Sequence, residues 1–305
     1  MDSITETIVP VAPFDFELTA GYHTYFQGRY GADSLLEGVY RRLLDLNGKL
    51  VLASVRSVGS VDKPALEVGL QGEGLTDGEV RLAVDRVGWL LGTGQELGPF
   101  YAMANEEPTM SAITQRFYGL HLPHTASVFE ALVLAILGQQ IATNVARIIR
   151  TLLIETYGPH QDFDGETYFA FPRPETLMAL SVEELRSMKL SQRKAEYVQG
   201  IALAAVEDTA SLEGLHRLDD EDVVQQVTSL RGVGHWTAQW LLIRALNRPD
   251  ALPLGDLALR RVVSRLYFDG ADLDDTRLEE FSRRWSPWRT YATVYMFTAM
   301  RSGMA

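Results

Sequence analysis

A glycine-rich turn between two helical segments constrains this chain more than any other feature. The turn, Leu230–Gly234, reads Leu-Arg-Gly-Val-Gly; a helical pattern runs from His235 to about Leu246, and Asp256 opens a second helix. Two glycines two residues apart let the backbone adopt positive φ and let another backbone approach closely. The N–H groups of such a turn, followed at once by a helix N-terminus, form an anion site that suits a phosphate. We therefore expect a tight, phosphate-binding helical hairpin.

Two other interpretations of the glycines stay open at this point. Gly232 and Gly234 begin the Gly-x-Gly-x-x-Gly pattern of dinucleotide-binding folds, but the third position is Thr237. The preceding segment, Val223–Ser229, also has a helical rather than a strand-like pattern. In the second interpretation, the glycines only join two packed helices.

Three side chains that follow the turn are ordinary when each is taken singly. Trp236 and Trp240 are four residues apart, so they share one helix face, and aromatic residues at that spacing usually belong to a core. Asp256 follows a Leu-Pro-Leu-Gly turn and begins an apolar helix, where Asp is a common N-cap. Taken singly, each residue predicts structure rather than chemistry.

Taken together, the hairpin glycines, Trp236-Thr237-Ala238 and Asp256 resemble the signature of the helix-hairpin-helix DNA glycosylases. Residues 284–292, Arg-Trp-Ser-Pro-Trp-Arg-Thr-Tyr-Ala, are similar to the run that ends the 3-methyladenine DNA glycosylase II (AlkA-type) branch. Phe129–Gln140 is similar to a helix of the same branch. The resemblance spans residue 14 to the end, with its motifs in the family's order.

The resemblance implies the fold. We expect an α+β N-terminal domain at residues 1–120, an antiparallel sheet packed on helices, and then an all-helical helix-hairpin-helix glycosylase region at 121–305. In the second region, two helical subdomains would enclose the active-site cleft. The sequence pattern agrees, with strand-like segments at Lys49–Val58 and Ala65–Gln71, an aromatic-rich stretch at Tyr25–Tyr30, and helical periodicity over Leu75–Leu91. From Ser127 the pattern is all helical, and Ser127 with Glu130 predicts a capping box.

The resemblance also implies the site. Asp256 would be the catalytic carboxylate. The base pocket would be lined by Trp236, Trp240, Tyr22 and Phe297. The DNA-binding residues would be Gly232, Gly234, Thr237, Gln140, Ile141, Arg260 and Arg289, with Gln140 or Ile141 filling the gap left by an extruded base. The carbonyl groups of Thr228, Leu230 and Val233 would hold a structural Na⁺ or K⁺ between the hairpin and a phosphate.

The expected reaction needs one carboxylate and no cofactor. Alkylation at a purine ring nitrogen makes the base a cation and a good leaving group, so the carboxylate has only to stabilise the oxocarbenium charge or orient a water. Many relatives also cut the strand with a lysine near the start of the helix after the hairpin. Here Trp236 occupies that place and no lysine follows Lys194, so we expect a monofunctional enzyme.

Composition limits the alternatives. The 305 residues contain no cysteine, which excludes disulfides and a Cys-ligated iron–sulfur cluster. The net charge is −12; residues 1–120 hold 9 Lys and Arg against 16 Asp and Glu, and the rest hold 19 against 24. Because no basic stripe is evident, binding to duplex DNA carrying alkylated bases should rely on hairpin N–H groups and a few arginines. Without a signal or membrane-spanning pattern, we expect a cytoplasmic, nucleoid-associated monomer with no membrane partner.

Three rival functions remain. A helix-hairpin-helix protein that only recognises damage would share the hairpin but would not need Asp256. An enzyme of the same fold could act on oxidised or mismatched bases. A generic helical domain with a coincidental Gly-x-Gly is disfavoured by the order of the three motifs.

Overall fold

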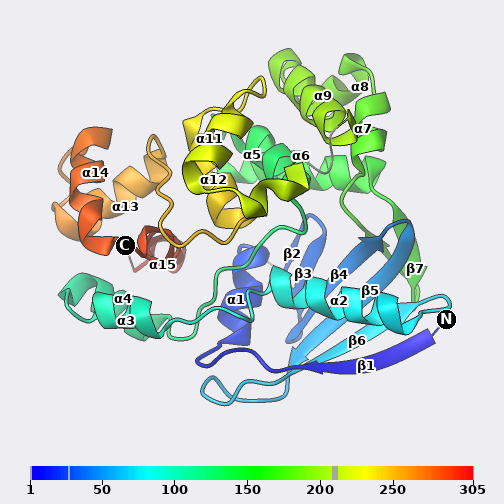
Figure 1. Cartoon of the computed structure of the whole chain (residues 1–305), viewed down its shortest axis with the longest axis horizontal. Helices are drawn as coiled ribbons and strands as arrows, with labels where there is room; N and C mark the ends of the chain where they lie inside the picture. The colour runs from blue at the N-terminus through cyan, green and yellow to red at the C-terminus, as the bar shows by residue number, and fades with distance from the viewer. Residues whose placement is uncertain (1, 27, 208–211, 305) are drawn as a thin grey trace.

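The computed structural model describes residues 2–26, 28–207 and 212–304. An antiparallel sheet with one helix across its face comes first, and a mostly helical region follows and curves above it (Figure 1). This arrangement confirms the expected fold class, an α+β part followed by a helix-hairpin-helix part.

The sheet has six strands in the order β1-β6-β5-β4-β3-β2, and every neighbouring pair is antiparallel. Two of its hairpins have two-residue turns with positive φ at both positions: Glu37-Gly38 at 52° and 72°, and Asn47-Gly48 at 55° and 100°. The strands are β1 (Asp2–Ile8), β2 (Arg29–Tyr30), β3 (Asp33–Leu36), β4 (Val39–Leu46), β5 (Lys49–Ser57) and β6 (Leu66–Gly72).

Helix α2 (Asp77–Leu90) covers one face of the sheet and confirms the periodicity predicted over Leu75–Leu91. A capping box of Thr76 and Glu79 begins it. The aromatic-rich stretch forms less strand than its composition indicates. Tyr25 and Phe26 have φ values of 52° and 56°, so they form a turn, and β2 begins only at Arg29.

The helical region is built from short helices. Helix α1 (Phe16–His23) precedes most of the sheet in sequence but lies beside the helical region. The others are α3 (Gly98–Ala104), α4 (Pro108–Arg116), α5 (Val128–Gly138), α6 (Thr143–Tyr157), α7 (Pro174–Ala179), α8 (Val182–Ser187), α9 (Gln192–Glu207), η1 (Gly214–Arg217), α11 (Asp220–Thr228), α12 (His235–Arg244), α13 (Leu257–Tyr267), α14 (Asp275–Ser282), η2 (Arg283–Trp285) and α15 (Arg289–Arg301). Within the described ranges, none of these is long and apolar enough to cross a membrane.

The prediction that the chain is all helical from Ser127 was wrong at one place. Residues after α6 form a two-stranded hairpin, β7 (His160–Phe163) and β8 (Glu166–Phe169). Its turn, Asp164-Gly165, has φ values of 52° and 84°. Phe163 is buried with Leu43 and Leu52 of the large sheet, so this hairpin extends the packing of the N-terminal part. The alternation of apolar residues around an Asp-Gly pair was the available signal.

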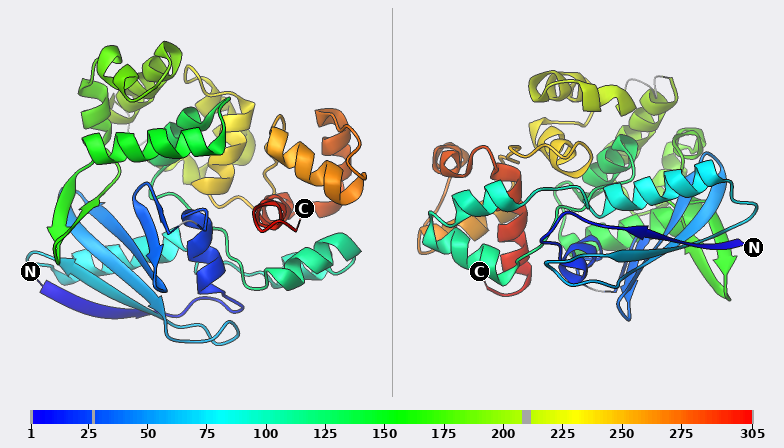
Figure 2. Two further views of the ribbon diagram at one scale, coloured as in Figure 1. Left: turned by 180° about the vertical axis from the view of Figure 1, so that it is seen from behind. Right: turned by 60° about the horizontal axis from the view of Figure 1, so that its bottom comes forward.

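Packing also crosses the predicted boundary at residue 120 in the other direction. Helices α3 and α4 lie away from the sheet, beside α15 at the far end of the chain (Figure 2). The hydroxyl groups of Tyr101 on α3 and Tyr295 on α15 are 2.8 Å apart. Segments on each side of residue 120 thus pack against the part of the molecule on the other side. The two-domain division at that residue therefore stays a prediction.

A buried charge network joins the two parts. Arg42 on β4 is 3% exposed and donates to both carboxylate oxygens of Asp33, at 2.9 Å. Its other edge donates to both oxygens of Glu130 on α5, at 2.8 and 2.7 Å. Nη1 of Arg42 thus serves Asp33 and Nη2 serves Glu130, so both buried carboxylates are hydrogen-bonded to the guanidinium group, which is the condition for tolerating buried charge.

Buried histidines predict a stability that depends on pH. Burial lowers the pKa of His23 and of His124 to about 4, so both imidazoles stay neutral in the fold. Because these folded-state values lie below the unfolded value of about 6.5, stability is complete above that pH and is lost as pH falls towards 4. We expect the unfolding free energy in urea to fall by roughly 4 kcal/mol between pH 7 and pH 5. His23→Gln should remove about half of that change, and His160→Gln, at an exposed position, should leave it intact.

Candidate active site

Asp256 lies at the N-terminus of α13 with both carboxylate oxygens engaged. Oδ1 accepts the backbone N–H groups of Ala258 and Leu259 at 2.9 and 3.0 Å, so the residue is the N-cap that its position predicts. Oδ2 accepts the indole N–H groups of Trp236 at 3.0 Å and Trp240 at 3.3 Å. A helix cap needs only the first oxygen. The two indoles fix the second and give the carboxylate one orientation.

The indoles belong to an aromatic wall. Trp236 and Trp240 lie on one face of α12, as their spacing predicts, with ring centroids 6.4 Å apart. The Trp240 ring lies 5.8 Å from Phe297 of α15. Both tryptophans are partly exposed and Phe297 is 4% exposed. The structure thus brings Asp256, both tryptophans and Phe297 together.

Tyr22 contacts two arginines that the sequence analysis did not single out, Arg301 and Arg244. Arg301 lies one turn after Phe297 on α15, and its guanidinium carbon is 4.5 Å from the Tyr22 ring centroid and 4.1 Å from that of Tyr25. Arg244 lies over Tyr22 at 5.5 Å. Within the described part of the chain, Nη1 of Arg301 is buried and has no hydrogen-bond partner. A buried free donor beside aromatic rings is a signal that sequence spacing does not carry.

The hairpin between α11 and α12 uses its two glycines differently. Gly232 has φ +92°, and a Cβ there would lie 2.3 Å from the ring of Tyr197 on α9. Gly234 has φ −98° and open space around its Cβ position, so the expectation of positive φ was wrong for this residue. Gly234 is the N-cap of α12, and no side chain of the described residues caps that helix. Its first N–H groups therefore remain available to an anion.

This difference between the glycines predicts different costs of substitution. Gly232→Ala should lower the unfolding free energy by roughly 2–4 kcal/mol, because it combines a left-handed backbone with a clash against an aromatic ring. Gly234→Ala should change it by less than about 1 kcal/mol. Urea unfolding of the two variants checks this, and equal costs would contradict the packing at Gly232.

The turn after α5 has its two predicted DNA residues in different environments. Gln140 is exposed with φ +54°, whereas Ile141 is half-buried against the helical core. Thr237 is 1% exposed, and its Oγ1 accepts Nε2 of Gln139 at 3.0 Å. The burial of Thr237 does not favour direct DNA contact by that side chain. The sequence analysis did not include Gln139 among the site residues, although its position next to Gln140 was a signal that it belongs to the same turn.

The two predicted DNA-binding arginines are engaged to different extents. Arg260 forms a long ion pair with Asp275, at 3.7 Å. Arg289 donates to both oxygens of Asp250 at 2.8 Å, and its backbone N–H donates to the same carboxylate at 3.1 Å. Arg289 therefore links α15 to the segment before Asp256. The ion pair of Arg260 with Asp275 is longer than that of Arg289 with Asp250.

The predicted cation ligands are backbone oxygens around the hairpin. The carbonyl of Leu230 accepts the N–H of Val233 at 3.0 Å, which leaves one lone pair of that oxygen for another partner. Carbonyl oxygens are hard ligands that suit an alkali cation. Across the described residues, no group of three or more His, Cys, Asp or Glu side chains is placed to hold a metal ion.

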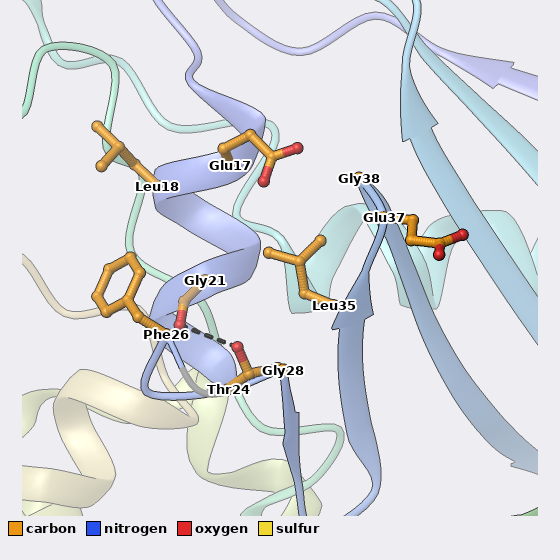
Figure 3. Close-up of a pocket in the computed structure, with 9 residues that line it drawn as sticks. All are labelled: Glu17, Leu18, Gly21, Thr24, Phe26, Gly28, Leu35, Glu37 and Gly38. Carbon is orange, nitrogen blue, oxygen red and sulfur yellow. Dashed lines mark hydrogen bonds between the residues drawn. The ribbon is translucent and has the colours of Figure 1, made fainter.

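A separate open pocket of about 340 Å³ lies between α1 and strand β3 (Figure 3). Glu17, Phe26, Leu35 and Glu37 contribute to its lining. None of the predicted site residues lines it. Two carboxylates at its rim would repel a phosphate backbone, so it is not the candidate site.

Comparison with known proteins identifies relatives of this chain. A family model described as HhH-GPD superfamily base excision DNA repair protein matches residues 133–288. A DNA-3-methyladenine glycosylase of Bacillus subtilis is 31% identical over 205 residues, covering 67% of this chain and 68% of that protein. The residues that the family model matches, 133–288, contain the hairpin and Asp256.

Solved structures extend the likeness over the whole chain. A 3-methyladenine DNA glycosylase from Archaeoglobus fulgidus superposes with a TM-score of 0.85 at 27% identity, covering 97% of this chain and 98% of that one. An 8-oxoguanine glycosylase/lyase of Clostridium acetobutylicum in complex with double-stranded DNA gives 0.76 at 16% identity, covering 99% of each chain. The second likeness concerns the fold alone.

Proposed function

The chain belongs to the HhH-GPD superfamily of base excision DNA repair proteins, and from this premise we propose that it is a monofunctional DNA glycosylase that excises alkylated bases from duplex DNA. The expected substrates are 3-methyladenine, 7-methylguanine and similar cationic bases. The observation that carries the proposal is the Asp256 carboxylate, with one oxygen capping α13 and the other held by two indole N–H groups.

The proposed chemistry uses charge rather than a hydrogen-bond pattern. A purine alkylated at a ring nitrogen is cationic, and the rings of Trp240 and Phe297 provide electron-rich faces worth ~0.5–2 kcal/mol per contact. As the glycosidic bond breaks, the base leaves with the bond electrons and becomes neutral. The negative charge of Asp256 stabilises the oxocarbenium ion that remains on the sugar, and water completes the hydrolysis.

The proposed contact with DNA centres on the hairpin. The uncapped N-terminus of α12 offers N–H groups to one backbone phosphate. Carbonyl groups of Thr228, Leu230 and Val233 would hold Na⁺ or K⁺ against the same strand, and the cation has no part in the chemistry. Gln140 is exposed at the tip of its turn, which supports it, ahead of Ile141, as the residue that enters the duplex.

The absence of a lyase step is proposed on sequence and geometry together. Trp236 stands at the place where a lysine nucleophile would be expected, and no lysine follows Lys194 in the sequence. Lys194 itself donates to the carbonyl oxygens of Leu137 and Gln139. A Schiff base with the sugar would require a free amine beside Asp256.

The test is a duplex with a single 7-methylguanine, incubated with the protein and analysed for free base and for strand breaks. We expect base release with strand breaks only after alkali, and no covalent product after borohydride. Breaks without alkali together with borohydride trapping would refute the monofunctional proposal. Binding of the damaged duplex with no base release would favour the rival that only recognises damage.

A further inference from the structure

The turn between α5 and α6, residues 138–142, needs support from outside itself. Gln140 has φ +54°, a left-handed conformation that costs a residue with a Cβ roughly 1 kcal/mol or more. It is also exposed, so its own side chain contributes little packing. Helix α5 ends at Gly138, two residues before Gln140, and the last carbonyl groups of a helix lack partners within the helix.

Lys194 supplies that support. This residue lies in the first turn of α9, and its Nζ donates to the carbonyl oxygens of Leu137 at 3.0 Å and Gln139 at 2.6 Å. The ammonium group therefore closes the C-terminus of α5 on both sides of Gly138. Burial, together with the nearby positive charge of Arg150, lowers the pKa of Lys194, because both disfavour the charged ammonium form.

Gln139 ties the same turn to the hairpin. Its Nε2 donates to the carbonyl oxygen of Gly232 at 3.0 Å and to Oγ1 of Thr237 at 3.0 Å. The turn that presents Gln140 and the hairpin that would bind phosphate are thus directly hydrogen-bonded, although they lie 93 residues apart in sequence.

Helix α9 holds the hairpin as well as the turn. The Tyr197 ring packs on Gly232, and Glu196 forms an ion pair with Arg231 of the hairpin at 3.1 Å. Lys194 lies less than one helical turn before Tyr197 on the same helix. One end of α9 therefore contacts both proposed DNA-binding loops.

We propose that Lys194, acting with Gln139, is a positioning residue that fixes the 138–142 turn relative to the hairpin, so that Gln140 enters the duplex in register with the gripped phosphate. This rests on the proposed function. Lys194 contacts neither the base nor the sugar in this account. Its loss should impair extrusion of a paired base more than the cleavage step that follows.

The test compares Lys194→Met, Lys194→Arg and a matched control, Lys189→Met, which removes one positive charge from an exposed lysine nearby. Each variant is assayed for base release from two duplexes, one with 7-methylguanine paired to cytosine and one with the same lesion opposite an abasic analogue. The unpaired lesion needs less energy to leave the stack. A second readout, the fluorescence rise of 2-aminopurine next to the lesion on binding, follows extrusion without requiring catalysis.

Lys194→Met should slow release from the paired duplex by about tenfold or more, slow release from the unpaired duplex by less than about threefold, and suppress the fluorescence rise. Lys194→Arg should restore most of both signals, because a guanidinium also donates to two carbonyls. Lys189→Met should match wild type. Equal losses on the two duplexes, or no loss on either, would overturn the positioning role. If wild type released no base, the proposed function would fail, while the fluorescence of the variants would still decide the role of Lys194.

Discussion

Asp256→Asn should greatly slow base release while leaving the fold and DNA binding in place. Asn is as good an N-cap as Asp, so the bonds from Ala258 and Leu259 can be kept through its amide oxygen. The amide lacks the negative charge that stabilises the oxocarbenium ion, and its NH₂ group would face the indole N–H of Trp236. We expect the single-turnover rate to fall by about 100-fold or more.

Asp274→Asn is the matched control for this variant. Asp274 is likewise the N-cap of a helix, α14, and accepts the N–H of Arg277 at 2.8 Å. It should keep full activity, and both variants should unfold at urea concentrations close to wild type. Affinity of Asp256→Asn for a duplex with an abasic analogue should stay within about threefold of wild type. Retained base release by Asp256→Asn would return Asp256 to the role of a helix cap.

Arg42→Met should cause the largest loss of stability. It leaves the carboxylates of Asp33 and Glu130 buried without their common partner, at an expected cost of roughly 3–5 kcal/mol in urea unfolding. Arg41→Met, at the neighbouring and partly exposed position on β4, is the control and should cost less than about 1 kcal/mol. Adding Asp33→Asn and Glu130→Gln to Arg42→Met should recover part of the loss, because no buried charge then remains. A small cost for Arg42→Met alone would contradict this account of the network.

The same network predicts how the stability of the protein changes with pH. Burial by itself raises the pKa of Asp33, but the charge of Arg42 and the hydrogen bonds from Tyr40 and Arg42 outweigh it, and the net pKa is lowered. A lowered folded-state pKa contributes stability above the unfolded value of about 3.9, and this contribution is lost as pH falls below it. Arg42→Met should therefore move the acid-unfolding midpoint to higher pH.

Local rules in the sequence predicted the elements that depend on neighbouring residues. The helix over Leu75–Leu91, the N-cap at Asp256 and the shared face of Trp236 and Trp240 follow from spacing and capping alone. The family resemblance added the meeting of these residues with Phe297, which no local rule predicts.

Contacts between distant residues lay beyond the sequence. Ser127 does cap α5, but the Glu130 carboxylate, predicted to complete a capping box, instead binds Arg42, 88 residues away. Arg289 resembled a DNA-binding residue and is held by Asp250. Lys194 donates to the carbonyl groups of Leu137 and Gln139, which lie more than 50 residues earlier in the sequence. In each case the side chain's partner depends on tertiary packing.

The central claim is that a carboxylate beside aromatic rings removes bases that carry positive charge. The most direct measurement is release of free base by wild type from two duplexes that differ only in the lesion, cationic 7-methylguanine or neutral 8-oxoguanine, each paired with cytosine. The account predicts release of 7-methylguanine and no detectable release of 8-oxoguanine. Release of 8-oxoguanine with 7-methylguanine left intact would contradict it.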